Sequence, residues 1–206
     1  MKKVKNTKNK GFSLVELMIA MSITLILMGL ASTLFAGALG TRNRESRRAD
    51  ALVSARAALS ALSREISNSG YGLTMNGIVT GDSGEQKIHF RANLYNEDYT
   101  TDSVGEDVTY FFDEVTKSIV RYDPNTTPTT SVIVNRISNV TFKYYDYNSD
   151  GIISPDGSTT PTSGTGRVMI TVTVALEEVV GQPKNQTITF TSDVTLRNST
   201  YMLNQY

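Results

Sequence analysis

The amino-acid sequence predicts an α+β protein, in which one long N-terminal helix packs on a C-terminal antiparallel β-sheet domain. A run of residues without any charge extends from Leu17 to Leu39 and is rich in helix-forming Leu, Met and Ala. Apolar residues then recur every three or four positions between Leu52 and Ile66, which is the period of an amphipathic helix. From Ile88 onward apolar residues alternate with polar ones, as in half-buried strands. Helix first and strands afterwards indicates segregated α and β layers.

The apolar run is long enough to cross a membrane. A helix needs about 20 predominantly apolar residues to span the hydrocarbon core, and the run from Leu17 to Leu39 meets this requirement. The leader before it contains no acidic residue and five lysines, namely Lys2, Lys3, Lys5, Lys8 and Lys10. An ordinary secretory signal has an apolar region of roughly 7 to 15 residues. The longer run favours a retained membrane helix.

A short motif joins the leader to the apolar run, and it reads Lys10-Gly11-Phe12-Ser13-Leu14-Val15-Glu16. With the long apolar helix behind it, this motif resembles the prepilin processing motif of type IV pilins and type II secretion pseudopilins. The resemblance implies that the prepilin peptidase cuts between Gly11 and Phe12 on the cytoplasmic face and methylates the new amine of Phe12. It also implies that Glu16 is the glutamate that this superfamily uses in filament assembly.

Glu16 places a carboxylate inside the apolar segment. An ionised side chain at membrane depth costs at least about 2.5 kcal/mol, so Glu16 needs either a partner or a position near the interface. Cleavage would create a positive amine at Phe12, and the Glu16 carboxylate could pair with the amine of a neighbouring subunit. The alternative is that Glu16 only reaches the lipid headgroups. We favour the assembly role, because an ionisable residue in a membrane helix is a functional candidate by default.

Composition bounds the classes of function. The 206 residues include 20 Lys and Arg and 20 Asp and Glu, and removal of the leader leaves 15 basic against 20 acidic residues, a net charge of −5. A mature chain of this charge is not expected to bind nucleic acid. The chain has no cysteine, which excludes disulfides and thiolate metal sites. Its length allows the part outside the membrane to bury a core.

The expected location depends on how the helix is oriented. Four arginines between Arg42 and Arg48 follow the apolar run, so basic residues flank both of its ends and their count does not decide the orientation. The prepilin resemblance implies that the leader lies in the cytoplasm and the C-terminal domain outside. The expectation is a single-pass protein of the cytoplasmic (inner) membrane that contacts membrane lipid first and then enters a periplasmic or cell-surface filament.

The helix is expected to continue beyond the membrane span. Its apolar stripe consists of Leu52, Ala55, Leu59, Leu62 and Ile66, and a Ser/Asn/Gly cluster that ends at Gly70 breaks it. The stripe lasts barely two heptads, so packing on its own domain is favoured over a coiled-coil seam. The predicted organisation is a cleaved leader at 1–11, a transmembrane and assembly half-helix at 12–40, an amphipathic half-helix at 41–70 and an antiparallel β domain at 71–206.

Alternating runs predict the strands of the β domain. Residues 108–112 and 118–122 flank a short polar segment and predict a hairpin, while 132–134 predict an edge strand. The remaining predicted strands are 88–94, 140–144, 168–176 and 188–196. Two polar stretches, 125–131 and 154–166, are predicted to be surface loops within the same domain.

A second and shorter resemblance lies in the β domain. The segment from Val140 to Asp146, together with the segment from Thr191 to Asn198, is similar to PilW-type minor pilins and J-type minor pseudopilins. It implies a low-abundance subunit at or near the filament tip, with sister minor subunits as partners. The superfamily resemblance implies the inner-membrane assembly platform as a further partner. The presence of Glu16 argues against a K-type minor pseudopilin, because that type characteristically lacks this glutamate.

The segment that begins at Asp146 matches the opening of a calcium loop, with oxygen ligands at alternate positions and a glycine for the sharp turn. The candidate ligands are Asp146, Asn148, Asp150, the backbone carbonyl of Ile152, and Asp156. The twelfth position is Gly157 instead of the usual glutamate, so any calcium affinity would be weak, on the order of 0.1 to 1 mM. We favour the alternative of an Asx-rich turn that needs no metal, and predict no other cofactor.

The sequence offers little basis for catalysis. His89 is the only histidine and alternates onto the outer face of its predicted strand, so a catalytic triad or a zinc site has nothing else to build on. We therefore predict a non-enzymatic structural subunit of a pilus or pseudopilus. The competing hypothesis is a ligand-binding module, either an adhesin or a DNA-uptake pilin, which exposed aromatic or cationic side chains would reveal. A membrane-anchored hydrolase would require a cleft with convergent ionisable groups.

Overall fold

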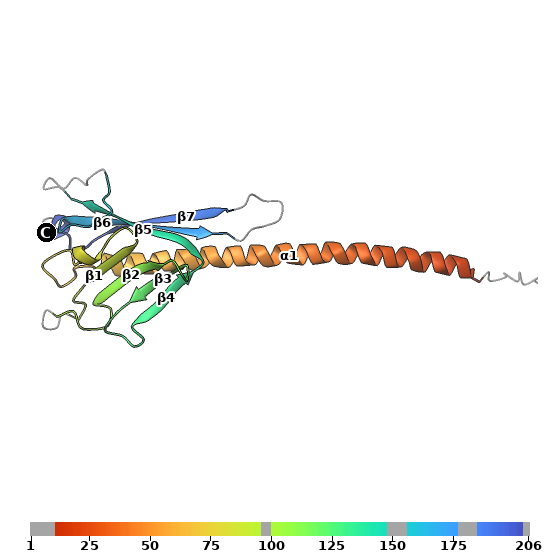
Figure 1. Ribbon diagram of the computed structural model, residues 1–206, viewed down its shortest axis with the longest axis horizontal. Helices are drawn as coiled ribbons and strands as arrows, with labels where there is room; N and C mark the ends of the chain where they lie inside the picture. The colour runs from red at the N-terminus through yellow and green to blue at the C-terminus, as the bar shows by residue number, and fades with distance from the viewer. Residues whose placement is uncertain (1–10, 96–99, 148–155, 177–184, 204–206) are drawn as a thin grey trace, which may run out of the picture. The chain divides into compact units, whose positions relative to one another are not determined.

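The computed structural model describes residues 11–95, 100–147, 156–176 and 185–203. Over these residues the chain forms the helix α1 (Leu14–Ser67), the 3₁₀ turn η1 (Thr80–Asp82), seven strands and the short helix α2 (Thr200–Leu203). One long N-terminal helix followed by antiparallel sheets confirms the predicted α+β class (Figure 1). The chain divides into two compact units, Met1–Ser46 and Arg47–Tyr206, and α1 contributes to both.

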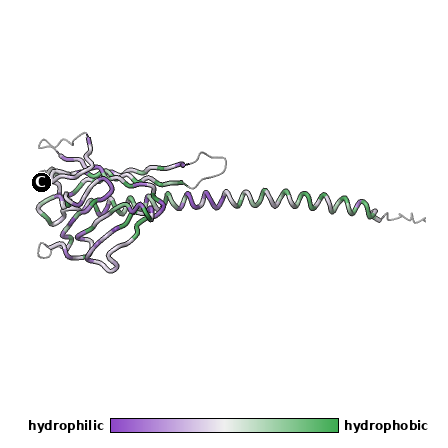
Figure 2. Tube along the Cα trace, in the orientation of Figure 1, coloured by the Kyte–Doolittle hydropathy of each residue, from purple (hydrophilic) through white to green (hydrophobic). Residues whose placement is uncertain are grey.

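From Leu17 to Leu39, within the first unit, α1 is apolar on all sides. Every residue from 11 to 39 is exposed, although most of them are hydrophobic (Figure 2). Among the described residues, α1 is the one helix long and apolar enough to cross a membrane, and none of its apolar window is buried within the protein. A core helix of a soluble protein would bury this surface, so its exposure supports membrane anchoring.

Hydroxyl groups within the apolar part of α1 are satisfied by the helix itself. The Ser22 hydroxyl donates to the Met18 carbonyl at 2.9 Å, and the Thr24 hydroxyl donates to the Ala20 carbonyl at 2.8 Å. Ser32, Thr33 and Thr41 make the same kind of bond to a carbonyl three or four residues earlier. These bonds remove the cost of placing a free hydroxyl in an apolar environment.

The part of α1 in the second unit is amphipathic and packs on its own domain, as predicted. Four of the five stripe residues are buried and Leu52 is half-buried; the buried ones are Ala55, Leu59, Leu62 and Ile66. The helix ends at Ser67, and Gly70 follows with φ +79°, a conformation that residues with a side chain rarely adopt. The Ser/Asn/Gly cluster therefore terminates the helix in the way the sequence indicates.

Two antiparallel sheets make up the rest of the second unit. The first has the strand order β1-β2-β3-β4 and the second has the order β5-β6-β7. The strands are β1 (Lys87–Arg91), β2 (Asp107–Asp113), β3 (Ser118–Tyr122), β4 (Thr130–Asn135), β5 (Ile137–Asp146), β6 (Thr165–Ala175) and β7 (Thr187–Thr195). All seven lie where alternation predicted a strand, and β4 is an edge strand as expected.

A single hydrophobic core joins α1 to the inner faces of both sheets. Alternate residues of each strand point into it, such as Ile88 and Phe90 of β1 and Phe142 and Tyr144 of β5. The intervening residues of β1 and β2 point outward, and the register pairs Lys87 with Phe111 and His89 with Thr109 on that outer face. The period-two pattern therefore assigns both faces of the first sheet.

Several predicted boundaries differ: β4, β5 and β6 begin two or three residues before the predicted starts, and the predicted end of the first strand is wrong. The sequence predicts a strand from 88 to 94, but β1 ends at Arg91 and Leu94 is 37% exposed. The backbone leaves the strand because the Asn93 amide donates to the Tyr71 carbonyl at 2.7 Å, which belongs to the loop after α1. This contact joins segments that are distant in the sequence, so local alternation does not reveal it.

Candidate functional site

The start of α1 is a capping box built from the predicted processing motif. The Ser13 hydroxyl accepts from the Val15 amide at 3.3 Å, and the Glu16 carboxylate accepts from the Ser13 amide at 2.9 Å. The Ser13 carbonyl also accepts the first helical bond, from the Leu17 amide at 3.1 Å. Serine at the cap with glutamate three residues later is the pattern that satisfies the free amides of a helix start.

The two residues at the predicted cleavage point lie outside the helix. Gly11 and Phe12 precede the first helical turn, and the Phe12 side chain is 86% exposed. A Cβ atom added to Gly11 would meet nothing within 4 Å, so the fold of this chain does not require glycine there. The structure therefore gives no packing reason for glycine at this position.

The Glu16 carboxylate stands at the end of an apolar groove along the first turns of α1. Phe12, Leu17, Met21 and Leu25 line this groove beside it. No basic side chain among the described residues pairs with Glu16, whose charge is met only by the Ser13 amide and the positive end of the helix dipole. The carboxylate is thus held in place and has lone pairs to spare for a cation from another chain.

The calcium prediction falls partly outside the described residues. Asn148, Asp150 and Ile152 are not among them, whereas Asp146 and Asp156 are. Both carboxylate oxygens of Asp146 accept hydrogen bonds, from the Thr165 hydroxyl at 2.8 Å and the Thr162 hydroxyl at 2.7 Å.

These bonds tie the end of β5 to the segment that enters β6, which is a structural role for Asp146. In the described part of the chain no group of three or more His, Cys, Asp or Glu side chains is arranged to hold a metal ion. Calcium binding by the whole loop stays a prediction.

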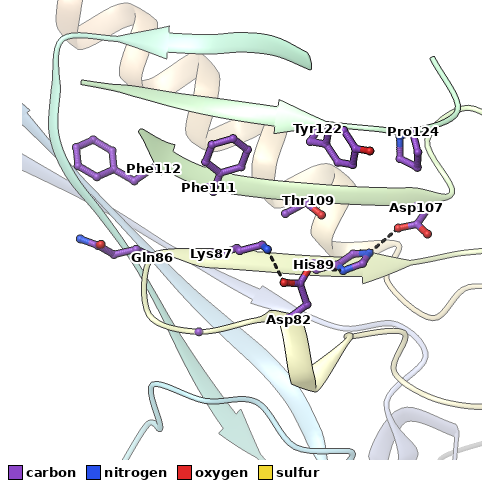
Figure 3. Close-up of a pocket in the computed structure, with 11 residues that line it drawn as sticks. Asp82, Gln86, Lys87, His89, Asp107, Thr109, Phe111, Phe112, Tyr122 and Pro124 are labelled. Atoms are coloured by element: carbon purple, nitrogen blue, oxygen red, sulfur yellow. Dashed lines mark hydrogen bonds and ion pairs between the residues drawn. The ribbon is translucent and has the colours of Figure 1, made fainter. Parts of the chain in front are cut away.

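His89 has neighbours that sequence reasoning missed. Its Nδ1 lies 2.9 Å from an Asp82 carboxylate oxygen and its Nε2 lies 2.5 Å from one of Asp107, so His89 has two acidic partners, although they form no zinc site among the described residues (Figure 3). Lys87 pairs with Asp82, and this hydrogen bond holds the pKa of the Asp82 carboxyl below its usual range. Only the pairing of β1 with β2 and the position of η1 bring these residues together.

The arrangement around His89 does not suit general-base catalysis. A general base needs a free ring nitrogen within reach of the proton that it removes. Here a carboxylate occupies each ring nitrogen, and the cross-strand neighbour Thr109 faces an imidazole that is already engaged on both sides. The cluster is better suited to binding than to nucleophilic chemistry.

Comparison with known proteins identifies the N-terminal region only. A family described as the prokaryotic N-terminal methylation motif matches residues 6–32, which include the processing motif and most of the apolar run. No curated protein and no solved structure matches the chain. The match supports membership of the type IV pilin and pseudopilin superfamily. It also supports a processed structural subunit with a membrane anchor, rather than an enzyme.

Proposed function

We propose that this protein is a minor structural subunit of a type IV pilus or a type II secretion pseudopilus. One observation carries the proposal: an exposed helix, apolar on all sides, begins with a capped carboxylate four residues after a Gly-Phe junction. A soluble protein buries such a surface. A subunit that moves from lipid into a helical bundle exposes it, first to lipid tails and then to other helices.

The geometry suggests how assembly proceeds. Cleavage between Gly11 and Phe12 removes the lysine leader and leaves a positive amine one helical turn from Glu16. Within one chain the carboxylate is already bound to the Ser13 amide. A neighbouring subunit can bring its amine to the remaining lone pairs, and the low dielectric makes this pair strong only when both charges are present.

The expected partners follow from this role. They are the prepilin peptidase, the inner-membrane assembly platform and other pilins or pseudopilins, including sister minor subunits in a complex at or near the filament tip. The helix would pack laterally in the filament, while the β domain, which is outside the membrane, selects its neighbours. Similarity to the PilW and J types supports the minor role.

The first test concerns processing. Gly11→Ala is expected to leave an unprocessed precursor, although the fold tolerates the methyl group, because nothing lies within 4 Å of the added Cβ. Immunoblotting and N-terminal sequencing of membrane fractions check this. Mature-sized Gly11→Ala protein at the normal level would contradict the assigned cleavage point.

The second test separates the charge of Glu16 from its capping role. Glutamine also completes a capping box, so Glu16→Gln keeps the bond to the Ser13 amide and loses only the charge. Glu16→Gln is expected to insert in the membrane but to be depleted from sheared filaments at least tenfold, as Glu16→Ala is. Asp50→Asn, farther along α1, is the matched control. Normal incorporation of Glu16→Gln would restrict Glu16 to a local cap.

The competing ligand-binding role gains one specific observation. Exposed Tyr122 and half-buried Lys87 and Phe111 lie around His89 on the outer face of the first sheet. The net charge of −5 for the mature chain argues against DNA as the ligand. An adhesin-like activity in addition to a structural role is therefore the second candidate.

A further inference from the structure

We propose that a hollow on the outer face of the β1–β4 sheet binds a neutral saccharide. This sheet hollow is lined chiefly by Asp82, Lys87, His89, Asp107, Phe111 and Tyr122 (Figure 3). Its volume of about 580 Å³ lies in the range of small-molecule sites. The inference concerns the β domain alone and does not depend on the proposed role of the N-terminal helix.

The sheet hollow is bordered by the turn η1 and by side chains of β1, β2 and β3. On one side η1 places Asp82 beside β1, where its carboxylate points toward Lys87 and His89 (Figure 3). On the other side Tyr122 ends β3 and Pro124 follows it. Thr109 of β2 lies between the two sides. The hollow therefore has an apolar wall, formed by Phe111 and Tyr122, beside a polar wall of charged side chains.

The apolar wall consists of rings that the core does not use. Phe111 and Tyr122 point to the outer face, opposite the buried Tyr110, and Tyr122 is 39% exposed. Aromatic faces at the surface of a hollow gain free energy when an apolar surface covers them. The ring of a sugar presents such a surface, because its C–H groups lie on its faces.

The polar wall is a row of paired polar groups. It runs from Lys87 through Asp82 and His89 to Asp107, which also pairs with Arg91 next to the hollow, where Arg91 Nε lies 3.0 Å from an Asp107 carboxylate oxygen. Each member of the row therefore already has a partner. A charged ligand would have to displace a member of this row or face a like charge, whereas a neutral ligand does neither.

A neutral hydroxyl can join the polar wall without breaking any pair. A carboxylate oxygen accepts more than one hydrogen bond, and a lysine ammonium has three N–H donors. Sugar hydroxyls both donate and accept, so they complement a row of alternating donors and acceptors. A purely apolar ligand would leave these groups desolvated and unpaired. A saccharide satisfies both walls at once.

The experiment uses the full chain in a zwitterionic detergent, because glucoside and maltoside detergents would compete for the site. The probes are cellotetraose, maltotetraose and N-acetylated chitotetraose, with tetragalacturonate as the acidic comparison. Saturation-transfer NMR and titration calorimetry measure the binding. We expect at least one neutral probe to bind, with saturation strongest at ring C–H protons, and tetragalacturonate to bind more weakly.

Aromatic variants test the location of the site. Tyr122→Ala is expected to weaken binding about tenfold, the upper range for loss of one aromatic contact. Phe111→Leu, which keeps most of the volume but removes the ring, is expected to weaken binding severalfold. Tyr71→Ala is the matched control, because Tyr71 is 52% exposed and lies outside the hollow. Thermal melting of each variant confirms that it is folded.

Three results would overturn the proposal: no binding of any neutral probe, equal binding by Tyr122→Ala and the parent, or preference for tetragalacturonate. The outcome is independent of the filament test. Tyr122→Ala is expected to enter filaments normally, and Glu16→Gln is expected to bind the saccharide normally. If the saccharide-binding results fail, the filament results are unaffected, and the reverse also holds.

Discussion

At the scale of single residues, two side-chain amides, of buried Asn76 and half-buried Asn198, fix the loop between α1 and β1. The Asn76 side chain donates to the carbonyls of Thr162 and Thr165, and the Asn198 side chain donates to those of Gly70 and Leu73. Each amide joins segments that are far apart in the sequence. Sequence patterns therefore did not reveal these roles. The processing motif could be identified from the sequence because its residues are contiguous.

Tyr144 links stability to alkaline pH. Burial raises the pKa of its hydroxyl above the ordinary value of about 10. Because the folded pKa is the higher one, its contribution to stability is complete below pH of about 10 and is lost as pH rises toward the folded value. The hydroxyl also donates to the Gly84 carbonyl at 2.9 Å and the Lys87 carbonyl at 3.1 Å.

Tyr144→Phe is thus expected to cost about 1 kcal/mol at pH 7, through the lost hydrogen bonds. Its free energy of unfolding should fall less steeply than that of the parent between about pH 9 and pH 11. Guanidinium unfolding at several pH values measures both effects, with exposed Tyr71→Phe as the control. An unchanged alkaline slope would contradict the role of Tyr144.

Asp146 allows the turn and the calcium loop to be told apart. Loss of its bonds to Thr162 and Thr165 should make Asp146→Ala less stable by about 1–3 kcal/mol in calcium-free buffer. If the loop is only a turn, millimolar calcium does not change the melting temperature of the parent protein. A calcium-dependent rise that disappears in Asp146→Ala combined with Asp150→Ala would establish the metal site.

At the scale of elements, hydrophobic period was enough to place α1 and the strands. The stripe ending at Ile66 packs in the core, and β6 follows the alternation from Val168 to Val174. The end of β1 was missed, since a contact with Tyr71 decides it. The hydrophobic period shows which face of a helix or strand is buried. It does not show where a loop from elsewhere in the chain ends a strand.

Gly77 tests how tightly the loop after α1 closes on β1. It has φ +75°, and a Cβ there would collide with the backbone of Gly70 and Arg91. Gly77→Ala is expected to lower the free energy of unfolding by about 2–4 kcal/mol, because it strains the backbone and displaces the segments around Gly70 and Arg91.

Gly81→Ala is the matched control for this substitution. A Cβ at Gly81 meets nothing within 4 Å, so the change should be close to neutral or slightly stabilising. Chemical denaturation of both variants makes the comparison. Equal stabilities would show that the loop yields to the methyl group.

At the scale of the whole molecule, the candidate processing and assembly site lies in one compact unit and the sheet hollow lies in the other. The sequence alone predicted the candidate processing and assembly site, because Gly11, Phe12 and Glu16 are neighbours in the chain. The sheet hollow could not be predicted, because the register between β1 and β2 and the place of η1 bring Asp82, His89 and Asp107 together.

The division into units predicts that residues 47–206 fold without the N-terminal segment. Among the described residues, their core includes both sheets and the stripe of α1 from Ala55 onward, with Ala51 packed against it. The fragment is expected to be soluble without detergent and to melt within a few degrees of the full chain in micelles. Circular dichroism checks both points, and aggregation or a non-cooperative transition would contradict them.

The internally bonded hydroxyls of the apolar half-helix bear on whether a subunit can return from the filament to the membrane. Ser22, Thr24 and Ser32 keep their hydrogen bonds whether lipid tails or other helices surround them. Transfer between the two surroundings therefore exchanges one set of dispersion contacts for another and breaks no polar bond. Under the proposed function, the bilayer then serves as a reservoir to which a subunit can return, and the balance between stored and polymerised subunits is left to the single charge pair at Glu16.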